Sequence, residues 1–223
     1  MFDFNKVEDF DKHISLSIPN YDQLFNTFKN IASIYSEPDS CVIDYGCSTG
    51  KFLLQLPKKK GCRYYGIDES SLIPPTTSSI HFFKEDAILF GEEINQRLEI
   101  DIPSNFLNQP SVVVCMFFLQ FLTKSERKKM LSVLKSQIDG GAVLLISEKI
   151  MLSDIKIDNI ISRLHIEEKR KNFTDTEILD KDRQILDSMY ILEETELLKE
   201  LNSIGNATKV WQSYNFCGYV VKK

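Results

Sequence analysis

The chain has 223 residues, of which 43% are apolar and 11% aromatic, and a formal net charge of −5. This length can bury one large core, and no linker rich in Pro, Gly or Ser divides it, so we expect a single domain over residues 1–223. The acidic balance excludes a broad basic face, so we expect no direct nucleic-acid partner. Five cysteines without a C-x-x-C pair, and the absence of a leader pattern or a membrane-length apolar run, predict a cytoplasmic protein with no membrane partner.

The first informative segment runs from Cys41 to Lys51. An apolar run ends in Asp44 and turns at once into a loop that contains Gly46, Ser48 and Gly50. Such a run bounded by glycine indicates a buried parallel strand, and the apolar periodicity that follows indicates the start of a helix. Glycine lets the backbone approach a ligand, and the free N–H groups of a helix N-terminus face it. The segment therefore predicts a strand-loop-helix nucleotide site.

Spacing separates the nucleotide loops that compete for this segment. A Walker A loop needs four residues between its glycines and Ser or Thr after Lys51, and neither condition is met. A dinucleotide fingerprint needs glycine at the positions of Ser48 and Lys51. The remaining pattern, Asp44-x-Gly46-x-Ser48-x-Gly50, resembles the first motif of class I S-adenosylmethionine (SAM) enzymes. On this segment alone, a glycine turn of some other α/β protein stays an alternative.

Two further strands are expected to bring acids to the same edge. The run from Arg63 ends in Asp68 and Glu69, at the distance where doubly wound folds place a ribose-binding carboxylate. The alternative role of Asp68 is that of a solvated acid that opens a loop. A third run, Ile80 to Phe83, precedes Asp86 and Ala87, where SAM enzymes usually place an acid near the adenine amino group.

The rest of the chain continues the alternation of strands and helices. We expect a strand over 111–116, a helix from Thr123 or Ser125 to about Gln137, a strand over 142–146, a helix over 194–201, and paired strands at 210–212 and 219–221. Residues 151–195 are expected to form two or three helices that cap the sheet. The short basic runs 58–60 and 169–171 are expected to be solvated. The predicted fold class is α/β, a Rossmann-like class I methyltransferase fold with seven strands, mostly parallel, the last antiparallel.

Co-linear motifs extend the resemblance to one family. The chain resembles the carboxy-S-adenosyl-L-methionine synthase family from about Phe10 to Gly218. The matching segments are Phe10, Ile14, Ser17-Ile18-Pro19 and Tyr21 before the first strand, Gly46-Cys47-Ser48, Leu119-Gln120-Phe121-Leu122, Ser125-Glu126-Arg127, Gly140-Gly141-Ala142, Ser147-Glu148-Lys149, Trp211, and Asn215-Phe216. Their order and spacing make the signal specific. The resemblance also implies lead-in helices within residues 1–36.

The resemblance implies an unusual reaction. In that family, SAM and prephenate give carboxy-SAM and phenylpyruvate, and a partner enzyme uses carboxy-SAM to carboxymethylate wobble uridine in transfer RNA. The implied ligand is SAM or carboxy-SAM, the implied second substrate is prephenate, and the implied assembly is a homodimer. No metal is required, and His13, His81 and His165 lack ligand spacing.

Two residues are carried over from the family pattern as ligand contacts. Arg183 is expected to be the catalytic group that grips the new carboxylate, because a guanidinium binds a carboxylate in bidentate fashion. Tyr21 is expected to form a wall near the methionine part of the ligand. We expect Cys47 to contribute only its backbone N–H or the packing of its side chain in the loop, because no neighbouring His or Lys indicates an activated thiolate. The alternative for Arg183 is a solvated position in a mixed-charge run.

The chain departs from the family pattern at three places. Met116 stands where the family has a ligand-contacting asparagine, so one amide contact is lost or supplied by backbone. The stretch from Leu89 to Pro110 is longer than in the family, and Asp182 is an extra residue before Arg183. Three hypotheses therefore stay open: a carboxy-SAM synthase, an ordinary SAM-dependent methyltransferase of unknown substrate, and a non-catalytic SAM-binding or carboxy-SAM-binding protein.

Overall fold

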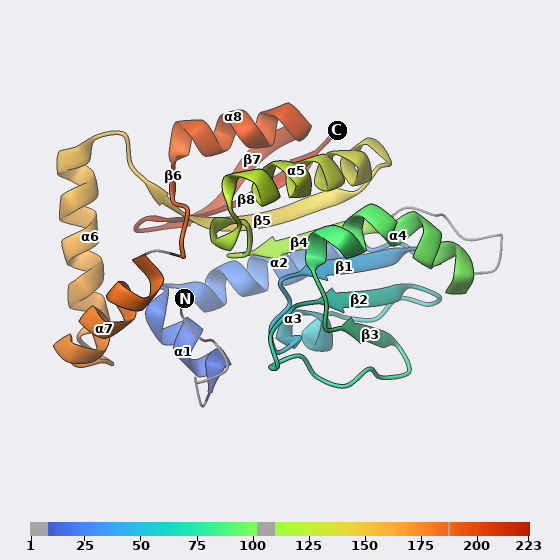
Figure 1. Ribbon diagram of the computed structural model, residues 1–223, viewed down its shortest axis with the longest axis horizontal. Helices are drawn as coiled ribbons and strands as arrows, with labels where there is room; N and C mark the ends of the chain where they lie inside the picture. The colour runs from blue at the N-terminus through green and yellow to red at the C-terminus, as the bar shows by residue number, and fades with distance from the viewer. Residues whose placement is uncertain (1–8, 102–109, 187) are drawn as a thin grey trace.

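The computed structural model describes residues 9–101, 110–186 and 188–223, which form one mixed sheet flanked by helices (Figure 1). The strands are β1 (Cys41–Tyr45), β2 (Arg63–Ile67), β3 (Ile80–Phe83), β4 (Pro110–Met116), β5 (Val143–Met151), β6 (Leu192–Glu193), β7 (Asn206–Ser213) and β8 (Phe216–Lys222). The helices are α1 (Phe10–Ser17), α2 (Tyr21–Tyr35), α3 (Lys51–Gln55), α4 (Ala87–Asp101), the 3-10 turn η2 (Leu119–Phe121), α5 (Lys124–Asp139), α6 (Ile155–Lys169), α7 (Asp175–Leu186) and α8 (Glu194–Ile204).

The strand order is β3-β2-β1-β4-β5-β8-β7. Strands β1 to β5 pair in parallel, and β8 is antiparallel to both β5 and β7. This arrangement confirms the predicted fold class, although the sheet has eight strands rather than seven. The additional strand is β6, which pairs with the last two residues of β5, Ile150 and Met151. It was missed because β5 runs five residues beyond the predicted end at Ile146.

Helices cover both faces of the sheet and enclose two apolar cores. Helices α2 and α3 pack on one face, and α4, α5 and α8 pack on the other (Figure 1). Parallel strands that are covered on both faces consist of continuous apolar runs, as the fully buried pattern of β1 shows. Helix α5 begins at a capping box in which Thr123 and Glu126 exchange hydrogen bonds.

The candidate site lies at one edge of the sheet, at the carboxyl ends of β1, β2, β4 and β5. Helices α6 and α7 extend beyond the end of β5 and lie beside α1 (Figure 1), where the Lys181 ammonium of α7 donates to Ser17 Oγ of α1 at 3.0 Å. Two helices therefore build most of the predicted cap. Within the described ranges, no helix combines the length and apolar character needed to cross a membrane.

Candidate functional site

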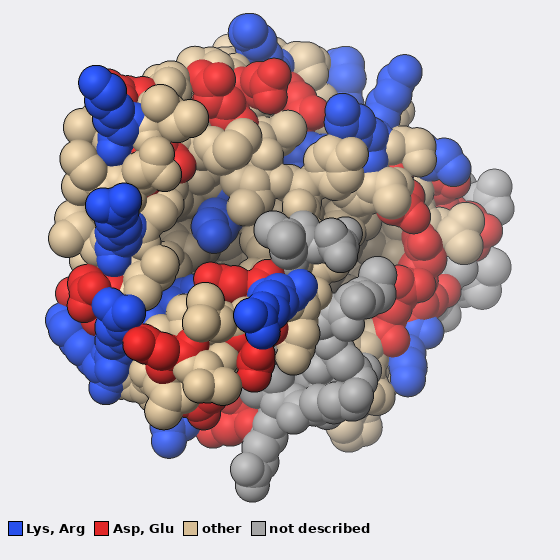
Figure 2. Space-filling view, turned by 60° about the vertical axis from the view of Figure 1, so that its left-hand side comes forward, with Lys and Arg blue, Asp and Glu red and all other residues tan. Residues whose placement is uncertain are grey.

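A cavity of about 750 Å³ opens where the parallel strands end. Figure 2 shows the hollow, with a basic side chain deep inside it. Loops after β1, β2 and β4 form one wall, and α1, α6 and α7 close the opposite side. The crevice beyond the carboxyl ends of parallel strands is the usual ligand position in open α/β sheets. The lining includes ten of the eleven residues predicted to bind ligand: Tyr21, Asp44, Gly46, Cys47, Ser48, Asp68, Glu69, Asp86, Ala87 and Met116.

The glycine loop is shaped for close backbone approach. Gly46 and Gly50 have φ angles of +74° and +67°, in the left-handed region that glycine adopts without strain. A Cβ on Gly46 would lie 2.7 Å from the Phe118 ring. Ser48 also has a positive φ of 49°, and its buried Oγ has no hydrogen-bond partner within the described part of the chain. The loop thus presents an unsatisfied hydroxyl beside a cradle that any side chain at Gly46 would fill.

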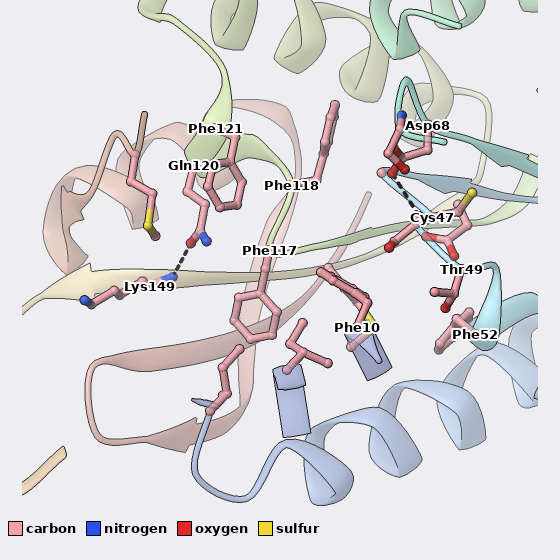
Figure 3. A pocket seen from close by; sticks show the side chains of 18 of the residues that line it. Phe10, Cys47, Thr49, Phe52, Asp68, Phe117, Phe118, Gln120, Phe121 and Lys149 are labelled. Carbon is pink, nitrogen blue, oxygen red and sulfur yellow. Dashed lines mark hydrogen bonds between the residues drawn. The ribbon is translucent and has the colours of Figure 1, made fainter. Parts of the chain in front are cut away.

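Two carboxylates make this end of the cavity acidic. Asp44 is 3% exposed, and burial, followed by repulsion from Asp68, raises its pKa well above the usual range for aspartate. The two Asp68 oxygens accept from the Ser48 and Ser70 backbone N–H groups, each at 2.8 Å. Figure 3 shows Asp68 bonded to the glycine loop. A carboxylate has about four acceptor sites, so Asp68 can order the loop and still accept from a ligand hydroxyl. A cationic ligand would relieve the repulsion between these acids.

Asp86 and Ala87 lie where the second acidic motif is expected. Asp86 Oδ1 accepts from the backbone N–H groups of Ile88 and Leu89, at 2.7 and 2.9 Å, and so begins α4. Ala87 is buried against the same cavity. The sequence assigned only ligand contact to Asp86, whereas the structure also gives it a helix-capping role.

Aromatic rings form the middle of the cavity wall. Phe117 follows β4 with a φ of +55°, which is strained for a bulky residue, and its N–H donates to the Ser147 carbonyl at 2.8 Å. Its ring lies between those of Tyr21 and Phe216, with centroid separations of 6.4 and 5.9 Å. Figure 3 places Phe117 and Phe118 between the Asp68 end and the Lys149 end of the cavity. Met116 lines the same wall and supplies a thioether in place of an amide.

The end of the cavity opposite the glycine loop is basic. Lys149 from β5, Lys169 from α6 and Lys181 from α7 line it, together with His13 and His165. Burial, and then the nearby lysines, lowers the pKa of His13 to about 4, and burial lowers the pKa of His165 to about 4. Both imidazoles are therefore neutral at pH 7, and the positive charge belongs to the lysines. Within the described ranges, no three His, Cys, Asp or Glu side chains cluster as a metal site requires.

Curated relatives identify the family. A carboxy-S-adenosyl-L-methionine synthase from Colwellia psychrerythraea is 31% identical over 230 residues, an alignment that includes the whole of this chain and 91% of the relative. The chain belongs to the carboxy-S-adenosyl-L-methionine synthase family. A second relative of that name, from Aliivibrio salmonicida, is 30% identical and covers 96% of this chain and 89% of its own length. No family model matches the chain. The predicted family and its enzyme class are therefore confirmed.

A solved structure confirms the fold independently. Magnesium protoporphyrin IX methyltransferase from Synechocystis PCC 6803, solved with bound SAH, is 15% identical to the chain and superposes with a TM-score of 0.54. The match covers 98% of this chain and 96% of that one. At this identity the likeness establishes the methyltransferase fold and nothing about the substrate.

Arg183 does not lie where the sequence placed it. Its side chain is 78% exposed, pairs with Asp180 at 3.6 Å, and is absent from the cavity lining. Lys181 and Ile185 of the same helix do line the cavity. Residues two apart on a helix point about 200° apart, so Arg183 faces away when Lys181 faces inward. The family pattern gives the position of Arg183 along the chain, but not the face of α7 on which its side chain lies.

Sequence reasoning also missed the basic end of the cavity. The run 169–171 was expected to be solvated, which holds for Arg170 and Lys171, but the Lys169 side chain is only 11% exposed. The sequence carries a signal for Lys181: it falls between Ile178 and Ile185 at spacings of three and four, on an apolar helix face. This position on the apolar face agrees with the place of Lys181 in the cavity lining.

Cys47 lies in the glycine loop, as the sequence places it. Burial raises the pKa of its thiol, and the neighbouring Asp44 and Asp68 act in the same direction. The thiol is therefore neutral and is not a nucleophile.

Proposed function

We propose that this chain is a single catalytic domain that binds SAM and converts SAM and prephenate into carboxy-SAM and phenylpyruvate. One observation supports the proposal most strongly. The same cavity is lined by the SAM-type glycine loop at one end and by lysines at the other. The adenosine would lie along Asp68, Glu69, Asp86 and Ala87, and the methionine part along the glycine loop and Tyr21. The cavity volume falls within the range of roughly 300–1,000 Å³ typical of small-molecule sites.

The residues at the acidic end fit a sulfonium nucleoside. The Ser48 hydroxyl offers a hydrogen bond that is unused among the described residues, and Gly46 lets the ligand approach the backbone. Asp44 and Asp68 line this end, and a bound cation would favour the charged form of Asp44, whose pKa burial and Asp68 raise. The rings of Phe117 and Phe118 add aromatic surface, which attracts cations and excludes water.

The reaction balances without an external oxidant or reductant. In prephenate, the bond between ring and carboxyl carbon breaks, its electron pair enters the ring, and the ring hydroxyl leaves as hydroxide, which yields phenylpyruvate. The carboxyl carbon forms a new bond to the SAM methyl carbon, which loses one proton. That proton and the hydroxide leave as water, so the leaving group itself serves as the base. The protein has to position two reactants and exclude solvent, which removes much of the entropic barrier.

Two observations favour an ordinary methyltransferase as the second candidate. Met116 replaces the amide of the family pattern, and Arg183 lies in solvent, as that hypothesis expected. The same two observations also favour a third candidate, a protein that binds SAM or carboxy-SAM without turnover. The family membership and the basic end of the cavity support the synthase over both.

The test is turnover of a defined mixture. Purified protein is incubated with SAM and prephenate, phenylpyruvate is followed by absorbance, and the nucleoside is examined by mass spectrometry. The proposal expects phenylpyruvate and carboxy-SAM in equal amounts, and Arg183→Leu is expected to keep full activity. SAM binding without phenylpyruvate formation would overturn the proposal in favour of the other candidates.

The family resemblance supports two further parts of the proposal. The product would be consumed by an enzyme that carboxymethylates wobble uridine in transfer RNA, while this chain itself contacts no nucleic acid. The active assembly would be a homodimer.

A further inference from the structure

The cavity has two ends of opposite charge. Asp44, Asp68, Glu69 and Asp86 line the end at the glycine loop, and Lys149, Lys169 and Lys181 line the other. Figure 3 shows Asp68 and Lys149 at these two ends, separated by the rings of Phe117 and Phe118. This separation of charge favours the binding of a cation at the acidic end and an anion at the basic end of the same cavity.

Hydrogen bonds fix the side chain of Lys181 and the backbone of Lys149. The Lys181 ammonium donates to Ser17 Oγ at 3.0 Å and to His13 Nε2 at 2.5 Å, so that the imidazole is a neutral acceptor. The backbone N–H of Lys149 donates to Gln120 Oε1 at 2.8 Å, as Figure 3 shows. An ordered side chain such as that of Lys181 loses little conformational entropy when it binds a ligand.

The nearby acids lie at the margin of the cluster. Asp182 approaches Lys169 at 3.5 Å but is itself half exposed. Asp158 acts on Lys149 from α6, and its Oδ1 already accepts from the Leu152 N–H and the Asn215 side chain. Burial, and then Lys169, lowers the pKa of Lys149, and the same causes lower the pKa of Lys181 to about 8. A bound anion would relieve this mutual repulsion.

We propose that Lys149, Lys169 and Lys181 form a subsite that binds the carboxylates of a small dianionic second substrate next to the nucleoside. The sequence assigned Arg183 to the new carboxylate of the product, whereas these lysines would bind the carboxylates of the second substrate. Lysine makes strong charge-assisted hydrogen bonds to carboxylates as a point charge, without the bidentate geometry of arginine. That the bound dianion then reacts with SAM rests on the proposed function; that it binds does not.

The experiment compares cavity lysines with matched surface cations. Lys149→Met, Lys169→Met and Lys181→Met are compared with Lys171→Met and Arg183→Met, whose wild-type side chains are 66% and 78% exposed. Isothermal titration calorimetry measures the Kd of SAM, and then the Kd of prephenate, phenylpyruvate and inorganic phosphate with SAM present. Each cavity variant is expected to weaken prephenate binding about tenfold or more, as the loss of one charge-assisted hydrogen bond implies.

The controls separate the subsite from misfolding and from general charge. SAM affinity is expected to change less than about threefold in every variant, because the lysines lie away from the glycine loop. Lys181→Arg is expected to restore most of the affinity that Lys181→Met loses. Prephenate is expected to bind more tightly than phenylpyruvate, which has one carboxylate, and more tightly than phosphate.

The possible results decide between the two proposals. If Arg183→Met weakens prephenate binding as much as Lys181→Met does, or if all three lysine variants bind it normally, the subsite is overturned. If phosphate binds as tightly as prephenate, the assignment to a dicarboxylate is overturned. If prephenate binds through the lysines but no phenylpyruvate forms, the subsite stands and the proposed reaction fails.

Discussion

Gly46 shows how one backbone position controls the site. Its φ of +74° costs a residue with a side chain about 1–2 kcal/mol, and a Cβ there would also meet three atoms of Phe118 within 2.9 Å. The ring must move, and it belongs to the wall that separates the two ends of the cavity. A change at this position therefore affects the ligand as well as the fold.

We expect Gly46→Ala to lower the free energy of unfolding by about 1–3 kcal/mol. It should also weaken SAM binding about tenfold or more, because the loop and Phe118 are displaced together. Urea unfolding and calorimetry measure the two effects. Gly141→Ala is the matched control, since Gly141 also has a positive φ, +107°, with no atom within 4 Å of the added Cβ. Normal SAM affinity in Gly46→Ala would contradict the assignment of the loop.

At the scale of elements, a buried ion cluster joins α5, β5 and α8. Arg127 donates to Glu148 Oε1 at 2.9 Å and to Glu200 Oε2 at 2.8 Å, and both Arg127 and Glu148 are buried. Burial raises the pKa of Glu148 to about 7, while Arg127 acts to lower it. Removing one partner of a buried pair leaves an uncompensated charge.

We expect Arg127→Met to lower the free energy of unfolding by about 3–5 kcal/mol at neutral pH. Lys135→Met, which breaks an exposed pair with Asp139, should change the free energy of unfolding far less, because solvent screens that pair. Without the guanidinium the pKa of Glu148 rises further, so its buried carboxyl is neutral in the folded variant at low pH. When the pKa of a carboxyl is higher in the folded than in the unfolded state, the protein is more stable at low pH. This stability is lost as the pH rises from the unfolded-state pKa to the folded-state pKa. Urea unfolding at pH 5 and pH 8 should therefore show a larger deficit at pH 8, and an equal deficit would contradict this account.

The elements also show which parts of the fold can be predicted from sequence. Strands β1 to β4 were predicted because apolar runs bounded by glycine or polar residues carry their own signal. Strand β6 has two residues and exists only because Ile150 and Met151 lie beside it, which local patterns cannot indicate. The loop residues expected to bind ligand follow strand ends and line the cavity, whereas the phase of α7 depends on tertiary packing. The assignment went to Arg183 because the family pattern contains an arginine there, whereas the cavity is lined by Lys181 of the same helix.

At the scale of the whole molecule, α6 exposes an apolar stripe. Ile157, Ile160 and Leu164 are 47%, 51% and 49% exposed, and their spacing of three and four places them on one face of the helix. Full burial of an exposed side chain of this kind contributes about 1.5–3 kcal/mol, and these half-exposed ones would gain about half of that each. A second copy of the chain related by a two-fold axis would cover this stripe with the same stripe, because a two-fold interface uses the same patch on both copies.

We expect the wild-type protein to be a dimer at micromolar concentration and the double variant Ile160→Glu, Leu164→Glu to be a monomer, because charges on the stripe would be buried without partners. Size-exclusion chromatography with light scattering measures the mass of each. Ile34→Glu on α2 is the matched control, since Ile34 is 77% exposed and lies outside the stripe, and it should remain a dimer. The cavity residues of α6 and α7 lie on the side of the cap that faces the sheet, so the monomeric variant should keep its SAM affinity. A monomeric wild-type protein, or a dimeric double variant, would show that the stripe is not the interface.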